Sequence, residues 1–150
     1  SLVGSEMCIR DRFNATQAQA QESIEPHYNY DGYTAYQSGF ILDKNFKESL
    51  KHDNFTINGY QISKNPTGDN RINLYDQTLY GVSENKANGV FFSLDGKSIN
   101  KNTLIQNYGQ PNSYSPTSAW GEEYMYKIGN KDVRFYIYNG YVIKCQIISE

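Results

Sequence analysis

The chain has little cysteine, histidine or proline and no excess of positive charge. Its 150 residues include two cysteines, two histidines and four prolines. Cys8 lies in an N-terminal stretch that we do not expect to fold, so Cys145 has no partner for a disulfide or for a Cys/His metal site. The formal charge of −2 excludes a global basic field that would attract nucleic acid or anionic lipid.

Long apolar runs and catalytic motifs are also absent. No run reaches the roughly 18 residues of a membrane-spanning helix, so we expect no membrane span. The sequence contains no GxSxG, no HExxH and no phosphate-binding glycine loop. His27 and His52 are isolated, and Cys145 lies in an expected strand, where it reads as a small apolar residue. We therefore expect no enzyme, no metal and no cofactor.

The N-terminal segment is expected to differ in origin from the rest of the chain, to judge from its back-translated sequence. Back-translation of Leu2–Asp11 gives the transposon-end adapter of short-read sequencing libraries, so residues 1–12 are expected to be an adapter-derived artefact. Residues 13–23 are expected to be the remnant of a signal peptide and a disordered N-terminus, because Ala18-Gln19-Ala20 fits a signal peptidase site. A low-complexity Gln/Ala tail is the alternative. Residues 24–150 are expected to form a single secreted α+β domain.

Aromatic residues are abundant instead, with 14 tyrosines and 7 phenylalanines, and they favour strands joined by tight turns. Only two segments predict helices. In residues 43–52, Phe46 and Leu50 are spaced four apart and Asp43 can cap the first turn. In residues 100–108, an asparagine cap precedes an apolar stripe, and the following glycine ends the helix.

Two Asn-Gly pairs predict β-hairpins, because both residues accept the positive φ that such turns require. They lie within residues 55–62 and 135–143. Further strands are expected near residues 72–83, 89–94 and 122–128. The pattern predicts an α+β fold in which an antiparallel sheet packs both short helices on one face. A helix followed by strands occurs twice, which suggests a degenerate duplicated unit.

The expected pairing of the C-terminal strands assigns their side chains to two faces of the sheet. A two-residue turn at Asn139-Gly140 places Tyr136 opposite Ile143, and a turn at residues 129–132 places Tyr126 opposite Phe135. The face expected in the core holds Tyr124, Tyr126, Ile128, Val133, Phe135, Ile137 and Val142. The face expected at solvent holds Glu123, Met125, Lys127, Arg134, Tyr136, Tyr138, Tyr141 and Ile143.

The solvent face combines rings and cations in the manner of proteins that bind single-stranded nucleic acid. Bases would stack on Tyr136, Tyr138 and Tyr141, while Lys127 and Arg134 would meet phosphate. The alternative is that tyrosine is simply a good strand residue, that cross-strand pairs stabilise the hairpin, and that another element covers part of this face.

The first predicted helix offers a second candidate for phosphate binding. Lys44, Lys47 and Lys51 follow one another at three and four residues, so they share one side of the helix. A phosphate backbone could lie along this stripe. The alternative is the solvated back of an amphipathic helix, with Asp43 and Glu48 reducing its field.

Several of these segments occur together in one known family. "QAQA", "YNYDGY", "FILDKNF", "HDNFTINGYQISK" and above all "YDQTLYGVS" stand in this order. The series resembles the immunodominant staphylococcal antigen B family from about Gln17 to the C-terminus. The resemblance implies a non-enzymatic protein, secreted or at the cell surface of a Staphylococcus-like Gram-positive bacterium. It also implies sequence-independent binding of extracellular DNA or RNA.

The C-terminal half carries a second similarity. "INKNTLIQNYGQP", "WGEEYMYKIG" and "VRFYIYNGYVIKCQI" follow the helix, Gly-x-Pro and three-strand pattern of small secreted modules. The outer-membrane assembly lipoprotein and β-lactamase-inhibitor-protein-like folds are examples of such modules.

The chain departs from the antigen B family in charge. Nucleic-acid-binding members of that family are basic, whereas this chain has a pI near 5.7, so binding requires clustered cations. The alternative function is a surface protein-interaction or inhibitor-like module. Its tyrosine-rich face would bind a host or bacterial surface protein.

Overall fold

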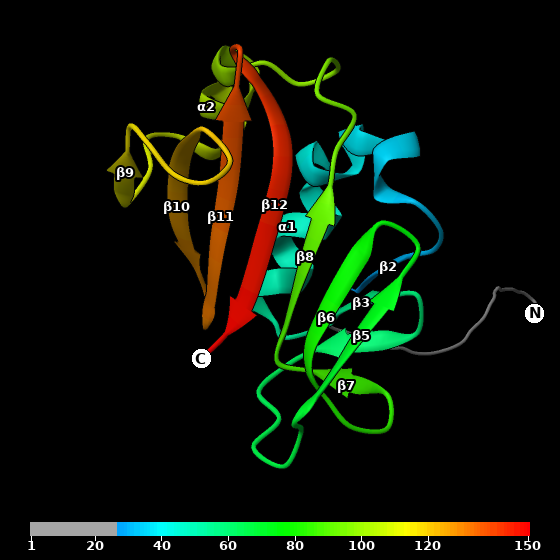
Figure 1. Ribbon diagram of the computed structural model, residues 1–150. Coiled ribbons are helices and arrows are strands. Elements are labelled where there is room, and N and C mark those ends of the chain that lie inside the picture. The colour runs from blue at the N-terminus through cyan, green and yellow to red at the C-terminus, as the bar shows by residue number, and fades with distance from the viewer. Residues whose placement is uncertain (1–26) are drawn as a thin grey trace, which may run out of the picture.

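The computed structural model describes residues 27–150, which fold into two sheets that share one hydrophobic core with the helices (Figure 1). The seven-stranded sheet has the order β5-β6-β8-β12-β11-β10-β9, and the four-stranded sheet has the order β2-β3-β4-β7. The strands of the larger sheet are β5 (Asn70–Leu74), β6 (Gln77–Val82), β8 (Gly89–Ser93), β9 (Ser113–Ser115), β10 (Glu122–Ile128), β11 (Lys131–Tyr138) and β12 (Tyr141–Ser149). Those of the smaller sheet are β2 (Tyr28–Tyr30), β3 (Phe55–Ile57), β4 (Tyr60–Ile62) and β7 (Lys86–Ala87).

Both predicted helices are confirmed, as α1 (Lys44–Lys51) and α2 (Lys101–Tyr108). The Asp43 carboxylate accepts from the Asn45 amide at 2.7 Å and caps α1. The Asn100 side chain caps α2 in the same way. Two short 3-10 helices, η1 (Thr34–Tyr36) and η2 (Ser38–Leu42), lie where the sequence predicts none. Within residues 27–150 no helix is long and apolar enough to cross a membrane.

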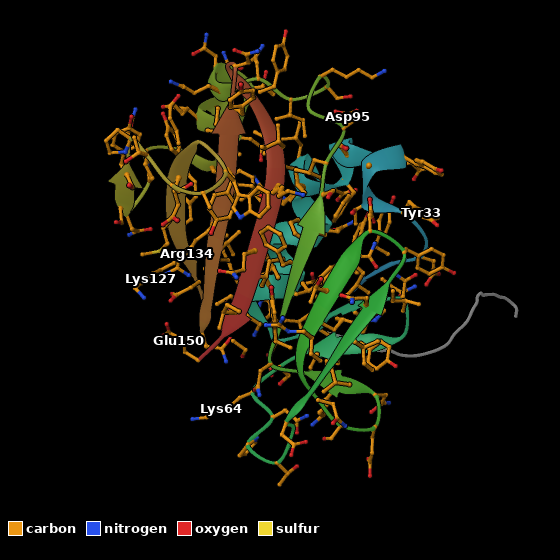
Figure 2. The ribbon with its side chains drawn as sticks, viewed as in Figure 1. Tyr33, Lys64, Asp95, Lys127, Arg134 and Glu150 are labelled. Carbon is orange, nitrogen blue, oxygen red and sulfur yellow. The ribbon has the colours of Figure 1, made fainter. Side chains whose placement is uncertain are left out.

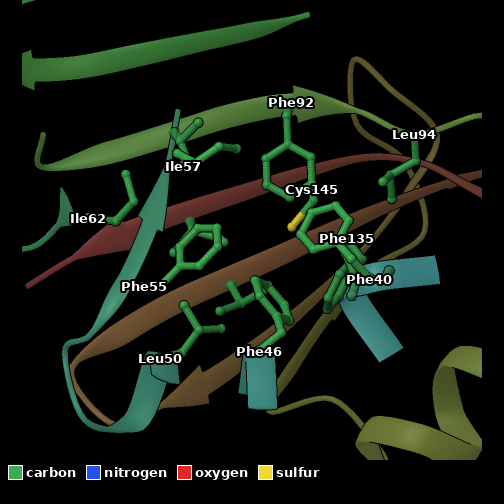
Figure 3. Packing of buried hydrophobic residues seen from close by; sticks show 14 of the residues in the cluster. Phe40, Phe46, Leu50, Phe55, Ile57, Ile62, Phe92, Leu94, Phe135 and Cys145 are labelled. Atoms are coloured by element: carbon green, nitrogen blue, oxygen red, sulfur yellow. The ribbon is translucent and has the colours of Figure 1, made fainter. Parts of the chain in front are cut away.

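Both α-helices pack on one face of the larger sheet, as predicted, and lie behind it in Figure 1. Phe46 and Leu50 of α1 and Leu104 of α2 are fully buried. Figure 3 shows Phe46 among rings from both sheets. Cys145 lies in the same core, and burial raises the pKa of its thiol well above the ordinary value. It therefore packs as the small apolar residue that the sequence predicts.

The expectation of one sheet is wrong, because the hairpin around Asn58-Gly59 joins the separate four-stranded sheet. The Asn58 and Gly59 φ angles of 49° and 87° confirm the turn itself. The strand expected near residues 72–83 is instead the β5–β6 hairpin, which turns at Tyr75-Asp76 without a glycine. The first helix-plus-strands segment contributes strands to both sheets, whereas the second contributes only to the larger one, so the structure does not confirm a duplication.

The predicted core face of the C-terminal strands is confirmed, but the predicted register holds only beside the Asn139-Gly140 turn, where Tyr138 pairs with Tyr141 and Ile137 with Val142. Tyr126 pairs with Val133 rather than Phe135, because the turn contains only residues 129–130. A shift of two residues leaves each side chain on its face, so the predicted core face is confirmed. A bulge places Lys144, not Ile143, opposite Tyr136.

A buried charge joins the β10–β11 turn to the end of α1. The Lys131 side chain is fully buried, and its Nζ donates to Asp53 Oδ1 and to Asn130 Oδ1, each at 2.5 Å. Asp53 Oδ2 in turn accepts from the Ser63 hydroxyl at 2.7 Å. This network ties the lower end of the larger sheet to the smaller one.

Buried phenols predict sensitivity to alkali. Burial raises the pKa of Tyr126 and of Tyr136 to about 12, and the Glu123 carboxylate reinforces the shift of Tyr136. In the unfolded chain both ionise near pH 10, so the stability that they contribute is complete below pH 10 and is lost as the pH rises towards 12. Burial also raises the pKa of Tyr108 well above the ordinary value. We therefore expect phenolate absorbance to show a late-titrating group that includes all three tyrosines, and circular dichroism to show unfolding in the same window. Full titration of all tyrosines near pH 10 with the fold intact would contradict this prediction.

Candidate functional site

A cleft lined by lysines lies between α1, the C-terminal end of α2 and the lower half of β10. Its volume is about 490 Å³. Four of the lining side chains are lysines and one is a carboxylate: Lys44, Lys47, Lys51, Lys127 and Glu48. We call this feature the lysine cleft. The three lysines that the helical spacing groups together therefore face a concave surface.

The α1 sequence produces this arrangement by dividing the helix into two sides. Phe46 and Leu50 point into the core, which leaves the lysine stripe on the side that faces α2. Lys47 lies at the contact between the helices. Its Nζ donates to Asn107 Oδ1 at 2.6 Å and to the Asn107 carbonyl at 3.0 Å, and it lies 5.1 Å from the centre of the Tyr108 ring.

The charges in the lysine cleft are only partly compensated. Burial, followed by the positive charge of Lys51, lowers the pKa of Lys47, and Glu48 opposes this shift. Lys51 pairs with Glu48 at 3.1 Å. Lys44 is exposed, with no ion pair inside the described range. The helix therefore presents a local excess of positive charge to the cleft.

Lys127 and Arg134 lie near each other, but each is compensated by acids. Lys127 Nζ lies 2.8 Å from Asp132 Oδ1 and 4.0 Å from Glu150, and the hydrogen bond to Asp132 raises the pKa of Lys127. Arg134 Nε lies 3.5 Å from Glu123. Figure 2 shows Lys127, Arg134 and Glu150 at the same end of the sheet. These two cations therefore do not form the open basic patch that the sequence suggests.

The predicted tyrosine face is only partly exposed. Tyr138 and Tyr141, beside the Asn139-Gly140 turn, keep 62% and 38% of their surface. The expectation that Tyr136 faces solvent is wrong, because it keeps only 7%. Phe91 of β8 packs edge-on against its ring at 6.1 Å, and the loop between β9 and β10 lies over this part of the sheet (Figure 1).

That loop brings a cluster to the outer face that the sequence does not indicate. Trp120 packs against Phe91 with ring centres 5.7 Å apart. Lys144 Nζ lies 4.9 Å from the Trp120 ring and 5.4 Å from the Phe91 ring. We call Phe91, Trp120 and Lys144 the Trp120 cluster. The alternation of side chains along β8 is enough to predict that Phe91 lies on the outer face. The positions of Lys144 and Trp120 depend on a bulge and on a loop, and neither produces a periodic pattern in the sequence.

A second aromatic cluster contains none of the predicted site residues. Tyr33 stacks on Tyr36 at 5.0 Å and meets Tyr75 edge-on at 5.0 Å. All three rings are exposed. The Asp76 carboxylate fixes their backbone by accepting hydrogen bonds from Thr34 and the amide of residue 35. Tyr33 is labelled in Figure 2 on the opposite side of the molecule from Lys127.

The part of the chain described here holds no group of three or more His, Cys, Asp or Glu side chains that could bind a metal ion. The expectations for the adapter-derived residues and the signal peptide remnant lie outside the described residues.

Comparison with known proteins gives one family and one fold. The sequence model of a family described as Immunodominant staphylococcal antigen B matches residues 27–147. Proteins of that description from Staphylococcus aureus strains USA300 and NCTC 8325 are 40% identical to the chain over 83 residues. The match covers 55% of this chain and 46% of theirs, so the chain spans about half the length of these curated relatives.

The fold is similar to that of a solved structure, the DUF4309 family protein YjgB from Bacillus subtilis. The TM-score is 0.51 at 16% identity, over 76% of this chain and 99% of that chain. This likeness concerns the fold alone. The expected similarity to the β-lactamase-inhibitor-protein-like fold is not confirmed.

Proposed function

The chain belongs to the immunodominant staphylococcal antigen B family, and from this premise we propose that it is a non-enzymatic protein that binds extracellular DNA or RNA without sequence preference. We also propose that it is secreted or held at the cell surface. The observation that carries the binding proposal is the lysine cleft, where Lys44, Lys47 and Lys51 converge beside a single glutamate.

The lysine cleft has the chemistry that a phosphate backbone requires. Lysines that neutralise phosphates release condensed counterions, and this term dominates sequence-independent affinity. The net charge of −2 does not oppose such binding where cations outnumber acids locally, as in this cleft with four lysines and one glutamate in its lining. Asn107, Gln110 and Asn112 add side-chain amides to the lining, and amides can donate to phosphate or sugar oxygens.

We expect the double variant Lys44→Gln/Lys51→Gln to weaken binding of single-stranded oligonucleotides and to flatten its dependence on salt. Each phosphate contact on a single strand contributes about 0.7 to the slope of log K against log salt, so two lost contacts reduce the slope by about 1.4. Fluorescence anisotropy of a labelled oligonucleotide, titrated at several salt concentrations, measures both quantities. Both lysines are exposed, so the fold should remain intact.

The matched control is Lys64→Gln/Lys97→Gln, which removes the same charge from two exposed positions outside the cleft. We expect this control to leave the slope within error of the parent protein. Equal slopes for the two double variants would contradict a role for the lysine cleft.

The second candidate function is a surface protein-interaction module. The exposed cluster of Tyr33, Tyr36 and Tyr75 favours it, because interface anchors are often tyrosines that bury a large rigid ring. Failure of the parent protein to bind any oligonucleotide at low salt would favour this function over nucleic-acid binding.

A further inference from the structure

Lys144 differs from Lys127 and Arg134 on the outer face of the larger sheet because it has no acidic partner among the described residues. Lys127 and Arg134 pair with acids, as described above. Lys144 Nζ instead donates to the Ser93 hydroxyl at 2.9 Å and lies against the Phe91 and Trp120 rings. An ammonium held between rings without an anion retains the capacity to bind one.

The ring beside this ammonium is available to a ligand. Trp120 keeps 43% of its surface exposed, although it contacts Phe91 on one side. An exposed indole next to an uncompensated ammonium matches a ligand that is both flat and anionic. A nucleotide within a single strand has this combination, since its base presents a π-face and its phosphate a negative charge.

We propose that the Trp120 cluster is a nucleotide site for single-stranded nucleic acid, in which an unpaired base stacks on Trp120 and the adjoining phosphate meets Lys144. This inference rests on the proposed function and adds a second contact outside the lysine cleft. A paired base inside a duplex cannot present its face to the ring, so the site selects single strands over duplexes.

The loop that carries Trp120 is held in place before any ligand binds. Ser118 Oγ accepts from the Trp120 amide at 3.1 Å and donates to the Gly121 carbonyl at 2.7 Å. Gly121 has a φ of 100°, and a Cβ at this position would lie 2.3 Å from the carbonyl oxygen of Ile137. Only glycine allows this close approach to β11. Because the ring is pre-positioned, binding needs little further ordering.

Two oligomers of equal length and phosphate number test the site, namely oligothymidylate and an abasic strand. Trp120 is the only tryptophan in the chain, so its emission reports stacking directly. We expect oligothymidylate to quench this emission and the abasic strand to bind without quenching. In anisotropy measurements with labelled strands, Trp120→Ala is expected to weaken oligothymidylate binding by about 5- to 150-fold and to leave abasic binding unchanged.

Two control variants separate stacking from other effects of the substitution. Trp120→Phe is expected to retain most of the affinity, because it keeps a ring in place. Tyr36→Ala removes a ring that is 79% exposed on another part of the surface, and is expected to bind both strands like the parent protein. Lys44→Gln/Lys51→Gln is expected to weaken both strands equally.

The outcomes separate this inference from the proposed function. Binding of both strands with unchanged emission, and with Trp120→Ala equal to the parent, would overturn the nucleotide site and leave phosphate binding in the lysine cleft. Binding of neither strand at low salt would overturn both. Quenching by oligothymidylate alone, together with the selective loss in Trp120→Ala, supports the site.

Discussion

Replacing Asp53 with alanine is expected to lower the free energy of unfolding by about 3 kcal/mol. Asp53 is the anionic partner of Lys131, whose side chain is fully buried. Removal of one partner leaves a buried charge that the remaining hydrogen bond to Asn130 cannot compensate. This loss of about 3 kcal/mol lies at the lower end of the range for breaking a buried ion pair, because the Asp53 side chain remains in contact with solvent.

Urea denaturation followed by circular dichroism measures this loss. Asp69→Ala is the matched control, because Asp69 is exposed in the loop before β5, and we expect it to change the stability by less than about 0.5 kcal/mol. The double variant Asp53→Ala/Lys131→Met is expected to recover much of the loss, since it removes the buried charge together with its partner. A loss below about 1 kcal/mol for Asp53→Ala would show that Lys131 finds another anion or water.

The burial of Lys131 cannot be predicted from the sequence, because the sequence patterns that predict structure are local. Helices α1 and α2 and both Asn-Gly turns were predicted correctly, since caps, apolar spacing and positive φ are encoded within a few residues. The position of Lys131 depends on a two-residue turn and on the approach of Asp53 from a segment 78 residues earlier in the chain. No local pattern distinguishes such a lysine from an exposed one.

The same distinction applies to the candidate site. The spacing of Lys44, Lys47 and Lys51 predicts their shared side, but not that α2 lies opposite and completes a cleft. Alternation along β11 places Tyr136 on the outer face, yet Phe91 of β8 packs against it and the loop between β9 and β10 lies over this part of the sheet (Figure 1). Such a loop has no periodicity from which its path could be predicted.

Helix α1 connects the stability of the fold to the proposed function, because it carries core anchors on one side and the lysine stripe on the other. Phe46 makes the main aromatic contacts of the core side, with ring centres 5.1 Å from Phe40 and Phe55. It also meets Tyr28 edge-on at 5.9 Å. The position of the lysines therefore depends on how tightly the Phe46 ring packs the helix against the core.

Replacing Phe46 with alanine is expected to lower the free energy of unfolding by about 4 kcal/mol, because it removes a fully buried ring and leaves a cavity between the helix and both sheets. Phe46→Leu keeps most of the apolar volume, and we expect a loss of about 1 kcal/mol. Urea denaturation measures both values. Where Phe46→Ala remains folded, its α1 is less tightly packed, so this variant should also bind oligonucleotides more weakly than Phe46→Leu does. Neither substitution removes a charge. Similar stability for the two variants would mean that α1 moves to fill the cavity. Unchanged oligonucleotide binding by a destabilised Phe46→Ala would mean that the lysines bind without the fixed helix geometry that the lysine cleft requires.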